Sequence, residues 1–107
     1  MEKEKMKIYI SGKITGDSNY YKKFLDAENR LYEAGFEPVN PAALAPASAD
    51  WNKAMRTVVG VMLKCDGVAL LPDWKGSRGA VIEERLARDV GLPVKPLAEW
   101  LAGRAGQ

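Results

Sequence analysis

A continuous apolar run followed by a glycine-rich loop and a helical pattern favours an alternating α/β architecture. The segment reads VALLPDWKGSRGAVIEERLA over residues 68–87. The run from Gly67 to Leu71 shows no polar alternation, which is typical of a parallel strand buried on both faces. A helix is expected over residues 80–90, beginning near the carboxyl end of that strand, where open α/β sheets bind ligands. Glu83 is expected in its first turn, beside backbone amides that attract anions.

The rest of the chain repeats this alternation of strand and helix patterns. Apolar residues spaced by three and four mark helices, and short β-rich runs mark strands. Strands are expected at 7–11, 36–39 and 93–95, helices at 20–34, from residue 51 to about 63, and 97–101, with a loop over 41–50. Alternating elements of this kind predict a three-layer α/β sandwich with a parallel sheet of four to five strands.

Length and charge limit the class of protein further. A chain of 107 residues is enough for a single domain, expected over residues 7–102 between a flexible tail at 1–6 and a disordered tail at 103–107. The net charge of +2 is too small and too diffuse to indicate a nucleic acid polymer as partner. Apolar runs fall well short of the roughly 20 residues that span a bilayer, so no membrane association is expected.

The absence of histidine narrows the possible chemistry. With no histidine and only Cys65, the chain has no His-activated nucleophile, no His-ligated metal site and no zinc cluster. Catalysis would use carboxylates, hydroxyls, Lys or Arg and backbone dipoles, so neither a metal nor a cofactor is expected. A single cysteine suits a reducing, cytoplasmic location.

Two loops are expected at the carboxyl edge of neighbouring strands. They are SGKITG after the first strand and PDWKGSRG after the third. Glycines allow close backbone approach to a ligand, and the Ser, Lys and Thr side chains supply donors suited to phosphate. The alternative is a pair of ordinary tight turns, because neither loop is a Walker A or GxGxxG motif. The candidate binding residues are Ser11, Gly12, Lys13, Ile14, Thr15, Gly16, Ser77 and Gly79.

Several candidate site residues also have structural interpretations. Glu83 could lie on an exposed face, where the helix dipole favours glutamate early in a helix. Tyr9 is either a packing residue or a hydroxyl that reaches the site, and Asp66 could simply cap a helix end. Trp51 lies on a helical stripe that favours a core position over stacking on a base. Arg78 is either a phosphate ligand or a surface residue.

Five segments together resemble a family of uncharacterised domains, DUF4406, of the nucleoside 2-deoxyribosyltransferase-like superfamily. They are KIYISGKITG, AGFEPVNPAAL, W-x-x-x-M-R, CDGVALLPDWKGSRGAVIE and the segment from Ala87 through GLPV, spanning about residues 7–95. The resemblance implies a flavodoxin/Rossmann-like fold and a homodimer or larger homo-oligomer.

The resemblance also implies a glutamate nucleophile, which Glu83 matches. In active superfamily members this carboxylate attacks the anomeric carbon of a deoxyribosyl group, expels the base and forms a glycosyl-enzyme. Tyr9 matches a site tyrosine, the loop from residue 11 to 16 matches the sugar or phosphate loop, and Ser77 matches a phosphate-binding serine of monophosphate hydrolases. Asp66 is a further supporting candidate.

Two positions depart from the pattern of active relatives. Val58 stands where they usually have an aspartate that handles the base, and Thr15 where the hydrolases have an arginine. Three functions therefore stay open. The chain is an N-glycosidase or deoxyribosyltransferase acting on a nucleoside or nucleotide, a nucleotide-binding module without turnover, or a protein-interaction domain.

Overall fold

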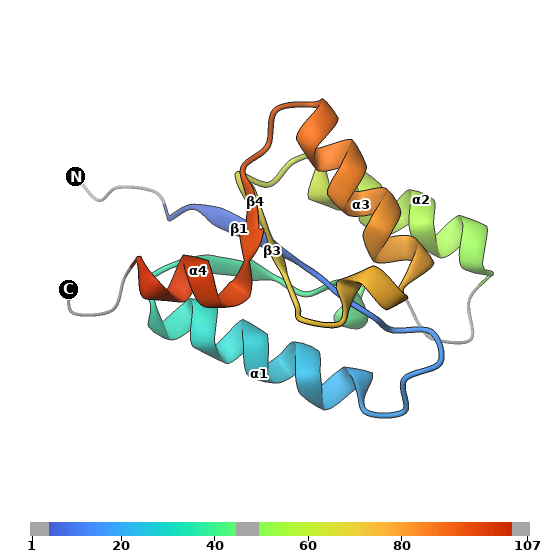
Figure 1. The fold of residues 1–107 in the computed structure, drawn as a ribbon, viewed down its shortest axis with the longest axis horizontal. Coiled ribbons are helices and arrows are strands. Elements are labelled where there is room, and N and C mark those ends of the chain that lie inside the picture. The colour runs from blue at the N-terminus through green and yellow to red at the C-terminus, as the bar shows by residue number, and fades with distance from the viewer. Residues whose placement is uncertain (1–4, 45–49, 104–107) are drawn as a thin grey trace.

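The computed structural model describes residues 5–44 and 50–103 as three layers around one parallel sheet (Figure 1). The helices α1 and α4 cover one face of the sheet, and α2 and α3 cover the other. This arrangement confirms the expected α/β sandwich and is a flavodoxin/Rossmann-like fold, with a sheet order of β2-β1-β3-β4. The strands are β1 (Lys7–Ser11), β2 (Glu37–Val39), β3 (Gly67–Leu70) and β4 (Val94–Pro96), and the helices are α1 (Tyr20–Glu33), α2 (Trp51–Met62), α3 (Arg78–Asp89) and α4 (Leu97–Ala102), with short 3-10 helices η1 (Pro41–Ala43) and η2 (Trp74–Gly76).

The period of two along the central strand divides its side chains between two cores. Ile8 and Ile10 of β1 pack with α1 and α4, whereas Tyr9 packs on the opposite face toward α2 and α3. Ser11 follows Tyr9 by two residues and shares its face. The strand therefore directs two hydroxyl groups toward α3, and this alternation is the basis of the site.

Glycines in the left-handed conformation follow two of the crossover helices. Gly35 (φ +94°) and Gly91 (φ +85°) adopt the left-handed conformation after α1 and α3. In each case the next residue donates its backbone N–H back into the last turn, Phe36 to the Leu31 carbonyl and Leu92 to the Ala87 carbonyl. This is the Schellman motif, which ends the helix and turns the chain toward the following strand.

The start of α3 differs from the sequence-based expectation. The Ser77 hydroxyl accepts a hydrogen bond from the Ala80 backbone N–H at 3.2 Å, so the helix begins at Arg78, two residues earlier than predicted. Glu83 consequently lies in the second turn, where the helix dipole has little effect, rather than in the first. At the start of α2, the Asp50 carboxylate is the N-cap and accepts from the Lys53 backbone N–H at 3.0 Å.

Other boundaries move by a residue or two, and some expectations lie outside the described residues. The loop predicted at 41–50 opens with η1, and its residues 45–49 are not described; most of both predicted tails also lies outside the described ranges. Across residues 5–44 and 50–103, every helix is too short or too polar for a membrane span.

The sheet order locates the place where a ligand would bind. From β1 the chain crosses to β2 on one side and then returns past β1 to β3 on the other. The loops after β1 and β3 therefore diverge to opposite faces at one edge of the sheet. Such a switch point leaves a crevice at the carboxyl ends of the strands.

Candidate active site

Glu83 is a buried carboxylate held by two hydroxyl groups from the central strand. Its side chain is only 5% exposed. The Tyr9 hydroxyl donates to Oε2 and the Ser11 hydroxyl donates to Oε1, each at 2.7 Å. Because each oxygen has a fixed donor, the carboxylate plane is held in one orientation. The surface interpretation of Glu83 is therefore wrong, since the residue lies on the face of α3 that packs on the sheet.

The surroundings of Glu83 act on its pKa in opposite directions. Burial raises the pKa of the Glu83 carboxyl, and the hydrogen bonds from Tyr9 and Ser11 lower it, leaving it above the ordinary value of 4.5. Burial, and then the charge of Glu83, raise the pKa of the Tyr9 phenol well above 10.0. Tyr9 therefore remains a proton donor to the carboxylate, and this donation favours the ionised form of Glu83.

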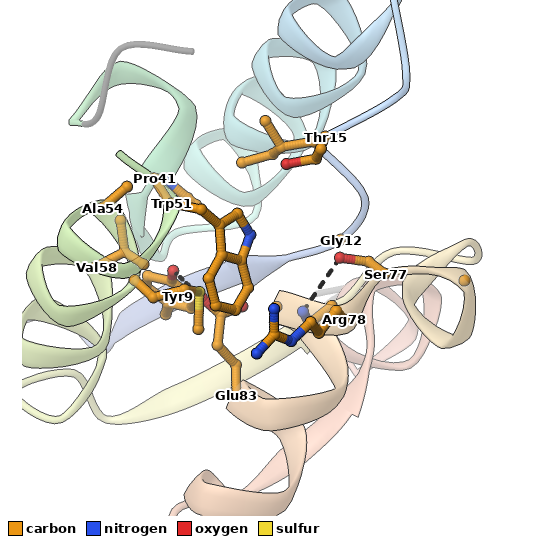
Figure 2. Close-up of a pocket in the computed structure, with 15 residues that line it drawn as sticks. Tyr9, Gly12, Thr15, Pro41, Trp51, Ala54, Val58, Ser77, Arg78 and Glu83 are labelled. Carbon is orange, nitrogen blue, oxygen red and sulfur yellow. Dashed lines mark hydrogen bonds between the residues drawn. The ribbon is translucent and has the colours of Figure 1, made fainter. Parts of the chain in front are cut away.

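Glu83 lies in a pocket of about 400 Å³ at the switch point (Figure 2). The pocket is large enough for a small organic ligand. Its polar wall comes from the loop after β1 and the start of α3, and its apolar wall comes from α2 and η1. The lining residues are Tyr9, Gly12, Ile14, Thr15, Pro41, Trp51, Ala54, Met55, Val58, Gly76, Ser77, Arg78, Gly79, Ala80 and Glu83.

The apolar wall is the inner face of α2. Trp51, Met55 and Val58 recur at helical spacing and line the pocket, whereas Arg56 and Thr57 are exposed on the outer face. Val58 is 7% exposed and packs in the same core as Tyr9. This face gives the pocket a hydrocarbon and aromatic surface suited to a planar heterocycle.

An aromatic–cation contact joins the two helices at the pocket. The Arg78 guanidinium lies 4.2 Å from the centroid of the Trp51 ring, and Figure 2 shows the two side chains beside each other. Trp51 is half-buried, so the expectation of a core position for it is wrong. Its helical stripe continues past the core and becomes a pocket wall.

The two strand loops are joined at the rim of the site by a lysine. Lys23, in the first turn of α1, forms ion pairs with Asp17 and Asp73 and donates to the Lys13 carbonyl at 2.9 Å. The Lys13 backbone N–H in turn donates to Asp73 at 3.1 Å. Lys23 therefore ties the loop after β1 to the loop after β3.

Close packing behind the loop requires a glycine. A Cβ atom at Gly12 would lie 2.7 Å from the Leu71 Cδ1 atom, nearer than real contacts allow. The absence of a side chain at this position lets the two loops approach each other directly below the pocket.

The structure brings most of the predicted site residues together, with three exceptions. Gly12, Ile14, Thr15, Ser77 and Gly79 line the pocket with Tyr9 and Glu83, and Ser11 contacts Glu83.

Asp66 is the clearest exception. Its carboxylate accepts from the Lys7 backbone N–H at 2.8 Å, at the start of β1, which is the opposite edge of the sheet. Asp66 therefore lies outside the pocket, because a residue that precedes a parallel strand is at the edge opposite to the one where that strand ends. Lys13 and Gly16 are not among the lining residues: Lys13 contributes its backbone to the loop contacts, and Gly16 has the turn conformation at φ +83°.

Sequence reasoning missed the apolar members of the site. Pro41, Ala54, Gly76 and Ala80 line the pocket, and none carries a functional group that would single it out. Ala54 was detectable, since it lies three residues after Trp51 on the stripe that faces the sheet.

Within the described residues, no group of His, Cys, Asp or Glu side chains is placed to hold a metal ion. The sequence profile of a family described as a domain of unknown function, DUF4406, matches residues 6–96. No curated protein matches the chain.

Proposed function

This chain belongs to the DUF4406 family, and from its pocket we propose that it cleaves or transfers the N-glycosidic bond of a (deoxy)nucleoside or its 5′-monophosphate. The reaction would pass through a covalent glycosyl–glutamate intermediate on Glu83. The segments around Glu83 that resemble the nucleoside 2-deoxyribosyltransferase-like superfamily support this assignment.

The observation that carries the proposal is the carboxylate itself. A glutamate that is 5% exposed and takes two hydroxyl donors at 2.7 Å needs a reason to be buried, because apolar residues would fill the same space at less cost in stability. Buried carboxylates with shifted pKa values that face a cleft are characteristic of functional sites. Retaining glycosyl transfer uses such a group as its nucleophile.

The chemistry follows from the two faces of the pocket. An oxygen of Glu83 forms a bond to the anomeric carbon, C1′, while the bond from C1′ to the base nitrogen breaks and its electron pair departs with the base. Water or a second base then attacks C1′, and Glu83 leaves as a carboxylate. The heterocycle would lie against Trp51, Met55 and Val58, and the sugar or phosphate near Thr15, Ser77 and Gly79.

The test measures, by chromatography, the release of free base from a panel of ribo- and deoxyribonucleosides and their 5′-monophosphates. We expect Glu83→Gln to abolish release, because an amide is not a nucleophile at carbon. Glu84→Gln is the matched control: Glu84 is the next residue of α3, pairs with Arg88 and lies outside the pocket, so activity should persist. Release by the Glu83→Gln protein would contradict the proposal.

Val58 supports a second candidate function, a nucleotide-binding module without turnover. The position is buried in the pocket wall, and its side chain cannot protonate a departing base. In this case a nucleotide binds saturably and is recovered intact after long incubation with the protein.

A further inference from the structure

We infer that the substrates of this pocket are N-glycosides whose base departs as a neutral molecule without taking up a proton. In such compounds the glycosidic nitrogen belongs to a cationic heterocycle, as in N7-alkylpurinium or pyridinium nucleosides and their 5′-monophosphates. The inference rests on the proposed function and specifies its substrate class.

The first step of the argument is the chemical nature of the wall formed by α2. The side chains of Trp51, Ala54, Met55 and Val58 present an indole ring, a thioether and aliphatic carbon to the pocket. The polar residues of the same helix, Asn52, Lys53, Arg56 and Thr57, are exposed on its outer surface. A base lying on this helix therefore contacts groups that neither donate nor accept a proton.

The second step is the set of ionisable groups in the lining. Over the part of the chain that the structure describes, they are Tyr9, Arg78 and Glu83. Glu83 is the nucleophile, and the Tyr9 hydroxyl already donates to it at 2.7 Å. The Arg78 guanidinium lies 4.2 Å from the Trp51 ring centroid, and arginine is not among the side chains that commonly act as general acids. The segment at 45–49 reads APASA and contains no ionisable side chain.

The third step is the fate of the electron pair. When the glycosidic bond of a neutral nucleoside breaks, its electron pair stays on the base. The base is then an anion unless it takes up a proton. An anion against the apolar face of α2 loses its hydration, and the one cation of the described lining, Arg78, already lies on the Trp51 ring. When the glycosidic nitrogen is part of a cationic ring, the same pair neutralises that charge and the base departs neutral. Substrate and nucleophile then have opposite charges before the reaction and form a neutral ester and a neutral base after it.

The experiment compares 7-methyl-2′-deoxyguanosine with 2′-deoxyguanosine, a pair that differs by one methyl group and one positive charge. Both are also assayed as 5′-monophosphates, and each rate is divided by the uncatalysed rate of the same compound, because the cation is intrinsically more labile. We expect the rate enhancement to be larger for the cation by about 10²-fold or more, which is the usual contribution of a general acid. Equal enhancements would overturn the inference.

A pair of variants tests the same point from the protein side. Val58→Asp introduces a proton donor on the base side, and the enhancement for the neutral nucleoside should rise toward that for the cation. Val58→Asn has nearly the same shape without the acid and should leave the ratio unchanged. If Val58→Asn raised the rate enhancement for the neutral nucleoside as much as Val58→Asp does, the inference would be contradicted. If Val58→Asp does not fold, the comparison of substrates on the wild-type protein decides.

These outcomes separate the inference from the proposed function. Release of base from neither compound, with intact recovery of both, would remove the proposed function itself. Equal enhancement of both, lost in Glu83→Gln, would retain the function and remove only the substrate class.

Discussion

Glu83 is held in a state that lowers the stability of the fold. Its pKa is raised by burial, so the folded protein binds this proton more tightly than the unfolded chain does. Stability must therefore fall as the pH rises from below the ordinary value of 4.5 through the folded pKa, and it stays lower above that range. A charge kept at such a cost in a cleft is typical of a site under functional constraint.

Replacing that charge should stabilise the protein in a pH-dependent way. Glu83→Gln should raise the unfolding free energy at pH 7 by about 1 kcal/mol, or roughly 4 °C or more in Tm. The gain should shrink to nothing as the pH falls below 4.5, where the wild-type carboxyl is also neutral. Thermal melts of both proteins across this pH range measure it.

The control for this prediction is Glu84→Gln. The Glu84 side chain is 17% exposed, pairs with Arg88 and lies outside the pocket, so its replacement should give no gain at pH 7. A gain from Glu83→Gln that is the same at acidic and neutral pH would show that something other than the charge is responsible.

The residues of the candidate site were only partly predictable from the sequence. Glu83 and Tyr9 were recognisable from the strand–loop–helix pattern and from the resemblance. Their hydrogen bond joins residues 74 positions apart, and no local pattern contains that distance. Asp66 directly precedes the predicted strand at 67–71, so the sequence order already places it at the amino end of that strand, away from the carboxyl edge where the site lies.

At the scale of elements, the two loops of the site depend on one side chain of α1. Burial lowers the pKa of Lys23, but its hydrogen bonds to Asp17 and Asp73 outweigh this and raise it. The hydrogen bond from Lys23 is also the main cause of the lowered pKa of Asp17. These groups connect α1 to the loops after β1 and β3.

Lys23→Met should loosen both loops. It removes the cation from two carboxylates that lie close together, so Tm should fall by a few degrees at neutral pH and ligand affinity should weaken. Because the pKa of Asp17 is lowered on folding, its contribution exists above the ordinary value of 3.8 and is lost as the pH falls through the folded pKa. The difference in Tm between the two proteins should therefore narrow in acid.

Lys22→Met provides the comparison, because Lys22 is the exposed neighbour of Lys23. An equal loss in the two variants would show that the loop contacts contribute nothing.

Element boundaries themselves followed closely from sequence, since Gly35, Asp50 and Gly91 have strong local preferences. The earlier start of α3, by two residues, did not, because the Ser77 cap lies within a glycine-rich loop pattern.

For the whole molecule, the last helix closes the core on the face opposite the pocket. The Trp100 indole N–H donates to the Val68 carbonyl at 2.9 Å, and its ring meets Phe36 edge-on at 5.6 Å between centroids. A Cβ atom at Gly67 would lie 2.8 Å from two atoms of the Trp100 ring. The C-terminal helix therefore docks only because β3 begins with glycine.

The same substitution should have opposite effects at two glycines. Gly67→Ala should destabilise the protein by about 1–3 kcal/mol, because the added methyl group displaces a packed ring. Gly60→Ala should stabilise it by about 0.5–1 kcal/mol, since Gly60 is exposed inside α2 with nothing within 4 Å of its Cβ position. Urea unfolding of both variants measures the difference, and a loss at both positions would contradict the account.

The layered fold was predictable because hydrophobic periodicity and turn residues agree along the chain. The shape of the pocket was not predictable, since it depends on how far the N-terminal end of α2, with Trp51, extends beyond the core toward Arg78. That distance is set by packing between layers.

Two of the three indole rings, those of Trp51 and Trp100, can act as optical reporters of different events. Trp51 lies at the pocket under a cationic side chain, and Trp100 lies in the core on the far side of the sheet. A ligand that enters the pocket changes the surroundings of Trp51 and leaves those of Trp100 unaltered, whereas unfolding changes the surroundings of all three rings, that of Trp74 in η2 included. With Trp51→Phe as the reference, intrinsic fluorescence can thus distinguish occupancy from denaturation in a single unlabelled sample.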